Sequence, residues 1–346
     1  MKTNLFGLTL SQLKSEVATL GLPAFTASQL ADWMYIKKVY SFLEMSNLSK
    51  QAREKLDANY CVLLTPPSKV ETSTDGTKKY LYPTKTSNFI EAAYIPDADR
   101  ATLCVSTQIG CKMGCLFCMT GKQGFQGNLS AGEIINQIQS LPEFEKLTNI
   151  VYMGMGEPLD NVEAVLNSIE IMTSDKGYGW SPKRITVSTI GIIPAMISFL
   201  EKSQAHLAVS LHSPFDSERQ EIMPIQSVYP ITEVIAEIKR WDLGRQRRIS
   251  FEYIMFNNVN DTARHANELV RLLSGIKCRI NLIRFHPIPN TPLEGTPMEG
   301  IVDFQNKLKA KGLTVTIRAS RGEDIFAACG LLSTKELLKV QLASDF

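Results

Sequence analysis

The chain has 346 residues, of which 44% are hydrophobic and 21% charged. This composition excludes a disordered or fibrous protein, and the length predicts two domains with a packed core. No apolar run reaches the roughly 18 residues that span a bilayer, so we expect a cytoplasmic protein without membrane association. The 37 Lys and Arg residues nearly balance the 35 Asp and Glu residues. The resulting net charge of +2 neither requires nor excludes a nucleic-acid partner.

The first sixty residues predict a small helical domain, residues 1–60. Apolar residues recur at helical spacing over residues 11–20, 27–39 and 48–60. Each run is preceded or opened by Ser or Thr, which are residues that cap helices. We expect three helices in a separate accessory domain.

A short β segment follows, residues 61–96. Asp75-Gly76 is typical of a hairpin turn between strands at residues 70–72 and 79–82, and a further strand is predicted over residues 89–94. We interpret this segment as a β linker between two modules.

Strand-like and helix-like runs alternate beyond residue 97. Strands are predicted at residues 103–107, 150–153, 185–189, 207–211, 250–256, 280–285 and 315–319. Amphipathic helices are predicted between them, at residues 131–141, 162–172, 194–200, 232–241, 263–273 and 301–310. Repeated βα units form a parallel sheet that curls into a full or partial barrel, which binds its ligands at the carboxyl ends of the strands. We assign residues 97–330 to this α/β barrel and residues 331–346 to a C-terminal tail.

Three of the seven cysteines lie close together in the loop after the first barrel strand. Cys111, Cys115 and Cys118 form a CxxxCxxC pattern. Three thiolates can hold three corners of a [4Fe–4S] cluster and leave one iron without a protein ligand. One alternative is a structural zinc site, which needs a fourth ligand that no nearby His or Cys provides. The other is three unligated cysteines, which would be prone to oxidation.

Glycines and polar residues follow the later barrel strands. Gly156 and Glu157 follow the second strand; glycine lets a backbone approach a ligand, and a carboxylate accepts hydrogen bonds from an ammonium group. The ends of the third, fourth and sixth strands carry Ser188, Ser210, Leu211, His212 and His286. A single Ser or His in such a place is usually a satisfied polar group without a ligand. Several strand ends of the same polarity, facing the cysteine loop, favour a cofactor pocket.

The cysteine spacing, with an aromatic residue before the last cysteine, resembles that of the radical S-adenosylmethionine (SAM) superfamily. Further motifs are similar to those of the RlmN/Cfr family of RNA adenine methyltransferases: residues 105–111, 121–125, 153–158, 188–191 and 321–330. The resemblance extends over nearly the whole chain, including the N-terminal helices. It implies a partial (βα)6-type radical SAM barrel, and it implies a [4Fe–4S] cluster and SAM as cofactors.

The resemblance also gives roles to two further cysteines and one carboxylate. By resemblance, Cys329 takes a methyl group from one SAM as a thioether, and a radical from a second SAM activates that methyl so that it adds to adenine. Cys104 then attacks the Cys329 sulfur and releases the product as a transient disulfide forms. Glu91 matches the family's proton acceptor at the adenine carbon. Without the resemblance, both cysteines would be read as buried apolar residues and Glu91 as a surface carboxylate.

Two members of the family act on different carbons of the same adenine in 23S ribosomal RNA. RlmN-type enzymes methylate C2 and Cfr-type enzymes methylate C8, and RlmN-type enzymes often also modify the adenine 3′ to certain tRNA anticodons. The segments Arg321-Gly322 and Lys122–Phe125 favour the RlmN type. Two positions depart from the family, His286 where many relatives have Asn and Leu331 where Gln is common.

We therefore predict an adenine-C2 methyltransferase. The alternatives are a Cfr-type enzyme, a non-catalytic iron–sulfur protein that binds RNA, and a radical enzyme that acts on a protein or a small molecule. The expected partners are 23S rRNA, tRNA and an electron donor such as flavodoxin or ferredoxin, and the expected state is a monomer. The basic residues expected to contact RNA are Lys37, Lys38, Lys50, Arg53, Lys55, Lys239, Arg240, Arg245, Arg247 and Arg248. We assign Cys61, Cys278, His206 and His265 to packing.

Overall fold

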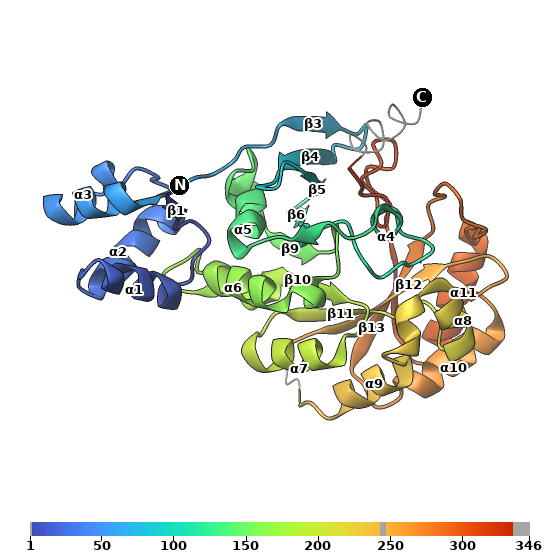
Figure 1. Cartoon of the computed structure of the whole chain (residues 1–346). Helices are drawn as coiled ribbons and strands as arrows, with labels where there is room; N and C mark the ends of the chain where they lie inside the picture. Colours follow the sequence, from blue (N-terminus) through green and yellow to red (C-terminus); the bar gives the residue numbers. More distant parts are fainter. Residues whose placement is uncertain (1, 243–246, 335–346) are drawn as a thin grey trace.

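A ten-stranded sheet forms the centre of the computed structural model, which describes residues 2–242 and 247–334 (Figure 1). The order of its strands is β14-β13-β12-β11-β10-β9-β6-β5-β4-β3. The strands from β14 to β6 in this order are parallel. They are β6 (Arg100–Cys104), β9 (Asn149–Tyr152), β10 (Ile185–Thr189), β11 (His206–Ser210), β12 (Ile249–Met255), β13 (Cys278–Arg284) and β14 (Thr314–Arg318).

Helices cover the outer face of the parallel strands (Figure 1). They are α5 (Ala131–Gln139), α6 (Val162–Thr173), α7 (Ile193–Lys202), α9 (Ile231–Lys239), α10 (Ala263–Leu273) and α11 (Met298–Ala310). The start of α5 shows why the sequence pattern succeeds, because Ser130 and Glu133 form a capping box ahead of an apolar stripe. The predicted strands and helices of the barrel are confirmed, with small shifts at their ends. The largest shifts are of three residues: the first strand begins and ends three residues earlier than predicted, at Arg100 and Cys104, and the last helix begins three residues earlier, at Met298.

Several short elements were not predicted from the sequence. They are α4 (Met119–Gln123), α8 (Asp216–Ile222) and an antiparallel pair, β7 (Gln108–Ile109) and β8 (Gly127–Asn128). Elements of this length carry no recognisable hydrophobic period, so pattern alone does not identify them.

The strands of the predicted β linker extend the main sheet. They are β3 (Lys69–Thr72), β4 (Lys78–Pro83) and β5 (Phe89–Asp97), and they run antiparallel to their neighbours. Strand β5 pairs with β6, so that Ala93 lies opposite Cys104. The residues of β5 that share a face with Ala93 therefore face the same side of the sheet as Cys104.

The two edges of the sheet are joined by the segment that follows β14. Asp324 accepts hydrogen bonds from Ser73 Oγ (2.5 Å) and Thr74 N (3.1 Å), and the Gly322 N–H donates to Asp75 Oδ2 (2.9 Å). These bonds connect the segment after β14, at one edge of the sheet, to the β3–β4 turn at the other edge. The open sheet is thereby curled around an internal cavity.

The N-terminal domain contains α1 (Leu10–Thr19), α2 (Phe25–Ala31) and α3 (Lys50–Asn59). A π-helical turn, Asp32–Ile36, continues α2, so the predicted helix over residues 27–39 ends three residues early. The domain is closed by β1 (Thr3–Asn4), which pairs with β2 (Tyr60–Cys61). No helix in the described part of the chain is both long enough and apolar enough to cross a membrane.

The N-terminal domain approaches the barrel closely where Gly7 meets α5. A Cβ atom at Gly7 would lie 2.0 Å from Gly132 Cα, and the Gly7 φ angle is +94°. Both the close approach and the backbone conformation therefore require glycine.

This contact predicts that Gly7→Ala destabilises the protein more than Gly21→Ala does. Gly21 also has a positive φ angle, +65°, but no atom lies within 4 Å of a Cβ placed there. Both variants carry backbone strain of about 1–2 kcal/mol, and Gly7→Ala adds about 1–3 kcal/mol of overpacking. Thermal unfolding midpoints of the two variants test this. Equal losses would show that the contact between Gly7 and Gly132 contributes nothing.

Candidate active site

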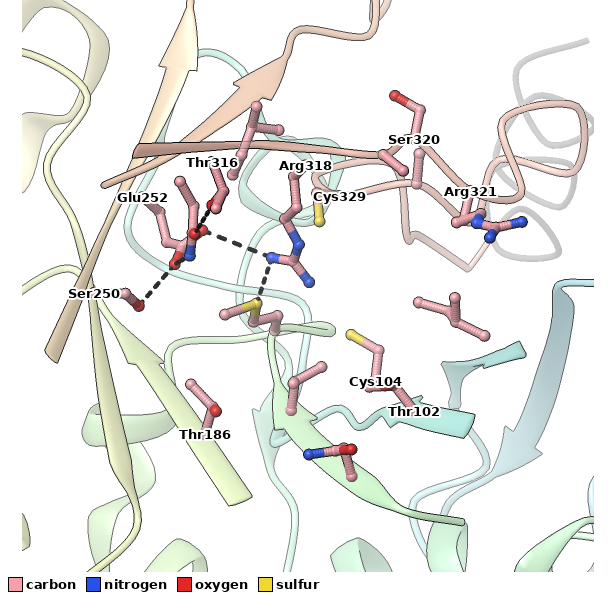
Figure 2. A pocket seen from close by; sticks show the side chains of 18 of the residues that line it. Thr102, Cys104, Thr186, Ser250, Glu252, Thr316, Arg318, Ser320, Arg321 and Cys329 are labelled. Carbon is pink, nitrogen blue, oxygen red and sulfur yellow. Dashed lines mark hydrogen bonds and ion pairs between the residues drawn. The ribbon is translucent and has the colours of Figure 1, made fainter. Parts of the chain in front are cut away.

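A cavity of about 460 Å³ lies inside the curled sheet. Much of its wall is polar, because many inward-facing positions of successive strands carry polar or charged side chains, although residues such as Val151 and Ile283 also line it (Figure 2). The polar and charged residues include Thr102, Thr186, Ser250, Glu252, Asn281, Thr316 and Arg318. Their neighbours on the same strands, such as Leu103, Val187 and Phe251, are fully buried in the hydrophobic core on the other face. The barrel therefore keeps its apolar core outside the sheet and leaves a polar interior for ligands.

Cys104 and Cys329 point into this cavity from opposite sides (Figure 2). Cys104 lies at the end of β6, and Cys329 lies in the segment after β14. Both thiols are unpaired. Burial and the nearby Cys329 raise the pKa of Cys104 to about 12, while the charge of Arg318 acts to lower it.

Arg318 was not predicted as a site residue. Its Nη1 atom donates to Met153 Sδ (3.0 Å) and lies 3.7 Å from Glu252 Oε2. The nearby Cys329 is the main cause of a raised pKa for Arg318. A lone Arg near the end of a strand gives no signal in the sequence, because the same pattern also fits an exposed strand end.

Glu91 is buried beside the segment that carries Cys329. Its Oε1 atom lies 3.2 Å from Lys79 Nζ, and its Oε2 atom accepts a hydrogen bond from Ser333 N (2.9 Å). Burial raises the pKa of Glu91 above its ordinary value, whereas Lys79 and the Ser333 N–H oppose this rise. The interpretation of Glu91 as a surface carboxylate is therefore wrong, since only 3% of the residue is exposed.

The segment around Cys329 is held by hydrogen bonds to α4. The Met119 N–H donates to Gly330 O (2.8 Å), and Thr120 Oγ1 donates to Leu332 O (2.7 Å). Because α4 directly follows the cysteine loop, these bonds connect Cys329 to that loop.

The cysteine loop, residues 110–118, lies between β7 and α4 in an apolar pocket. Cys111, Cys115 and Cys118 are surrounded by Met113, Phe117, Ile190, Met223, Phe256 and Phe285. A Cβ atom at Gly110, where φ is +71°, would lie 1.6 Å from Gly124 O, so the loop closes only with glycine there. No group of three His, Cys, Asp or Glu side chains between residues 2 and 334, outside 243–246, is arranged around a single metal ion.

The electrostatics of the loop favour a positively charged group among its thiols. Burial and the nearby thiols of the loop raise the pKa of Cys111 to about 12 and that of Cys115 well above its usual range. The charge of Arg219 acts to lower the pKa of Cys115. Thiolates in such a pocket are stabilised only by positive charge, which an iron–sulfur centre supplies. Three closely spaced thiols in an apolar pocket therefore fit a [4Fe–4S] cluster.

Glu157 lies next to this loop and connects two strand ends. Its Oε1 atom accepts from Thr189 Oγ1 (2.6 Å) and Leu159 N (3.1 Å), and its Oε2 atom accepts from Ile190 N (3.0 Å). Burial raises the pKa of Glu157 to about 7, although these hydrogen bonds act to lower it. A carboxylate offers about four acceptor directions, so one remains for a ligand.

Gly156 packs against β7, the short strand that precedes the cysteine loop. A Cβ atom there would lie 2.5 Å from Gln108 Cβ, and the φ angle is +97°. Glycine is therefore required at this position by packing within the protein.

His212 lies directly against the cysteine loop. Its ring meets the Phe117 ring edge-on at 4.8 Å, and its Nδ1 atom accepts from Ile254 N (3.0 Å). Burial lowers the pKa of His212 to about 3, so the ring is neutral and carries its proton on Nε2. Nε2 is thus left as a hydrogen-bond donor.

The remaining predicted cofactor contacts lie in two places. Ser188 and Ser210 are half-buried at neighbouring strand ends, whereas the Leu211 side chain belongs to the core, so only its backbone can reach a ligand. His286 instead lines the cavity, where its Nε2 atom lies 3.1 Å from Ser320 Oγ and its Nδ1 atom 3.3 Å from Glu323 Oε1.

Arg219, which was not predicted as a site residue, connects the strand ends beside the cysteine loop. Its fully buried guanidinium donates to Ile190 O (2.9 Å), Ser210 O (3.0 Å) and Leu211 O (3.1 Å). It lies on α8, whose charged residues resemble those of an exposed helix. No pattern in that segment indicates its burial.

The basic residues predicted to contact RNA differ in their exposure. Lys37 and Lys38 lie over the Trp33 and Phe144 rings, at 3.9 and 3.8 Å from the ring centroids. Arg247 is buried and donates to Leu200 O and Ala205 O, so its prediction as an RNA contact is wrong. Arg248 lines the cavity, and Arg245 lies outside the described residues. The others are Lys50, Arg53, Lys55, Lys239 and Arg240, which bond to nearby backbone or carboxylate groups.

Two of the residues assigned to packing also make polar contacts. His206 lines the cavity, and its Nδ1 atom accepts from Arg248 N (2.9 Å). The His265 ring belongs to the capping box of α10, and its Nε2 atom lies 2.7 Å from Glu218 Oε2. Cys61 and Cys278 are half-buried.

Comparisons with known proteins give one consistent result. The model of the Radical SAM superfamily matches residues 105–272, and that of the ribosomal RNA large subunit methyltransferase N-terminal domain matches residues 3–62. The chain is 56% identical to a "Probable dual-specificity RNA methyltransferase RlmN" of Parabacteroides distasonis, over 96% of this chain and 97% of the relative. It is 41% identical to the "Dual-specificity RNA methyltransferase RlmN" of Syntrophus aciditrophicus, over 97% and 98% of the two chains.

A solved structure agrees with these relatives. The chain matches a radical SAM methyltransferase from Sphaerobacter thermophilus with a TM-score of 0.87 and 38% identity, over 95% of this chain and 99% of that one. The expected fold class is therefore confirmed. Because these relatives match nearly the whole chain at 41–56% identity, the chain belongs to the RlmN family of dual-specificity RNA methyltransferases in the radical SAM superfamily.

Proposed function

We propose that this protein methylates C2 of an adenine in 23S ribosomal RNA, and of the adenine 3′ to the anticodon in a subset of tRNAs. The observation that carries the proposal is the pair of unpaired thiols, Cys104 and Cys329, that line one cavity next to a three-cysteine loop. Adenine C2 has no lone pair to attack an activated methyl group, so the methyl must first be held elsewhere. Two thiols, one to carry the methyl group and one to release the product, meet that need.

Family membership implies a [4Fe–4S] cluster and SAM as the cofactors. Together they supply a 5′-deoxyadenosyl radical that removes a hydrogen atom. Cys111, Cys115 and Cys118 hold the cluster in our proposal. Gly156, Glu157, Ser188, Ser210, Leu211 and His212 form the SAM site beside it, where the free acceptor direction of Glu157 and the Nε2–H of His212 are available. His286 is the weakest member of this set, because its ring lies in the thiol cavity.

The two thiols of the cavity and Glu91, which is buried beside the segment that carries Cys329, divide the remaining work. The Cys329 sulfur gives up its proton, forms a bond to the methyl group and later bonds through that carbon to adenine. Glu91 accepts the proton that leaves C2. The Cys104 thiolate then attacks the Cys329 sulfur, so that a disulfide forms and the sulfur–carbon bond breaks with its electron pair on the carbon, which takes up a proton to complete the methyl group. The transient disulfide is supported by the position of the two thiols on facing walls of the cavity (Figure 2).

The partners follow from the substrate. Lys37 and Lys38 follow the π-helical turn of the N-terminal domain, where they pack over aromatic rings and pair with Asp32 and Glu145. Their partly exposed ammonium groups are candidates for contacts to RNA phosphates. Because the reaction consumes electrons, we infer an electron donor of the flavodoxin or ferredoxin type. We further propose that the protein acts as a monomer in the cytoplasm, where its RNA substrates are found.

The Arg321-Gly322 and Lys122–Phe125 segments favour C2 over C8 as the methylated carbon.

The SAM site predicts that Glu157→Ala weakens SAM binding more than Thr189→Val does. Both variants lose the hydrogen bond between Thr189 and Glu157, but only the first loses the carboxylate. A charge-assisted bond to the ammonium group of SAM contributes about 1.5–3 kcal/mol. We therefore expect a further loss of about 10- to 100-fold in affinity by calorimetry, at unchanged iron content. Equal affinities in the two variants would return Glu157 to a purely structural role.

The central prediction separates the two thiols of the cavity. Cys329→Ala never carries the methyl group and never bonds to RNA. Cys104→Ala completes both steps but cannot break the bond between Cys329 and adenine, so it accumulates as a covalent adduct with RNA. The adduct should survive denaturing electrophoresis, disappear after nuclease digestion and leave a nucleotide mass on the Cys329 peptide.

The same experiment decides between the proposed function and its alternatives. A non-catalytic iron–sulfur protein or an enzyme of another substrate class gives no adduct in either variant. Normal turnover by Cys104→Ala would contradict the role of Cys104 in product release. A methyl group found at C8 of the product adenine would instead support the Cfr-type alternative.

A further inference from the structure

Three charged side chains form a row across β3, β4 and β5. Lys79 Nζ lies 3.0 Å from Glu71 Oε2 and 3.2 Å from Glu91 Oε1. Glu71 is directly opposite Lys79 in the β3–β4 pair, and Glu91 is diagonally opposite Lys79 in the β4–β5 pair, because Lys79 pairs with Ala93 and Leu81 pairs with Glu91. The row runs from a partly exposed carboxylate to a buried one, since 33% of the Glu71 side chain is exposed and 4% of the Glu91 side chain.

Lys79 is an unusual residue for its place. Only 5% of its side chain is exposed, and lysine is almost never buried without a partner. A buried ion pair often contributes less to stability than an apolar pair of the same size, so stability alone does not explain it. Its ammonium group has two carboxylate partners, and the deeper of them is the proposed proton acceptor.

We propose that Lys79 is a positioning residue, whose ammonium group holds Glu91 as an oriented carboxylate ready to accept the proton that leaves adenine C2. This inference rests on the proposed function. In the step concerned, the C2–H bond breaks, its electron pair stays with the adenine carbon, and an O–H bond forms on Glu91. The step itself needs no oxidant or reductant.

The surroundings of Glu91 support this role. Lys79 binds one carboxylate oxygen, and the other oxygen faces Ser333, four residues after Cys329. The orientation that Lys79 imposes therefore turns the second oxygen toward the segment that would carry the methyl group. The charged groups that act on Glu91 are Lys79, which favours the carboxylate, and Glu71, which disfavours it. Without Lys79, burial and Glu71 would both favour the protonated acid, which cannot accept a proton.

The test compares Lys79→Met, Lys79→Arg and Glu71→Gln in single-turnover methylation of an RNA fragment at several pH values. We expect Lys79→Met to acquire the methyl group on Cys329 normally but to methylate RNA at least tenfold more slowly at pH 7. Because the pKa of Glu91 rises without Lys79, the acid limb of the pH–rate profile should move to higher pH. Lys79→Arg should restore both rate and profile. In Glu71→Gln the acid limb of the pH–rate profile should stay in place or move to lower pH, because this variant lacks the negative charge that acts to raise the pKa of Glu91.

Methylation of Cys329 reports whether each variant is folded and loaded with its cofactors. If Lys79→Met fails that check, Lys79→Gln replaces it, because glutamine keeps a hydrogen-bond donor but no charge. An unchanged rate with an unshifted acid limb in the charge-free variant would overturn the role of Lys79. Failure of the proposed function looks different, because the wild-type protein would then form no 2-methyladenosine, or Glu91→Gln would keep the full rate.

Discussion

The site depends on the path of residues 319–334, which cross from the last strand of an open sheet to its opposite edge. Asp324 and Gly322 bond to the β3–β4 turn, and Ser333 bonds to Glu91 on β5. A sheet with β14 at one edge and β3 at the other would otherwise leave Cys104 and Cys329 on separate surfaces. The same segment bonds to α4, directly behind the cysteine loop. One stretch of chain therefore brings together the two thiols, the carboxylate and the cysteine loop.

The distribution of polarity across the sheet explains how the barrel can hold this chemistry. The outer face of the strands packs against helices and supplies the hydrophobic core, whereas the inner face is lined with hydroxyl, amide and charged groups. Each buried charge has a neighbour of opposite sign or a set of hydrogen bonds, as Glu91 has Lys79 and Arg219 has three carbonyl groups. The cysteine loop lies in a separate apolar pocket at one end of this polar space. Radical chemistry at the cysteine loop and polar recognition of a base can thus take place side by side.

The sequence allowed the barrel to be predicted because strands and helices repeat with clear periods. The spacing of three cysteines pointed to the radical SAM superfamily, to which the chain belongs. The sequence did not reveal which strands pair, so the continuity of β3, β4 and β5 with the barrel came only from the structure. Arg219 and Lys79 escaped notice for a related reason. A charged residue on a helix or a strand is normally exposed, and the partners of these two lie on neighbouring strands and strand ends, whose arrangement the sequence does not reveal. For Glu157 the sequence suggested a ligand contact but not a structural role. The structure shows that its carboxylate also accepts three hydrogen bonds within the protein.

The central claim is that Cys329 carries a methyl group before any RNA is bound. Mass spectrometry of the purified, iron-containing protein tests it directly through the tryptic peptide of residues 322–335, in which Cys329 is the only cysteine. We predict that this peptide is heavier by one methylene unit, with fragment ions that place the added mass on the sulfur. The same peptide from Cys118→Ala should be unmodified. An unmodified Cys329 in wild-type protein that holds its cluster and has been supplied with SAM would contradict it.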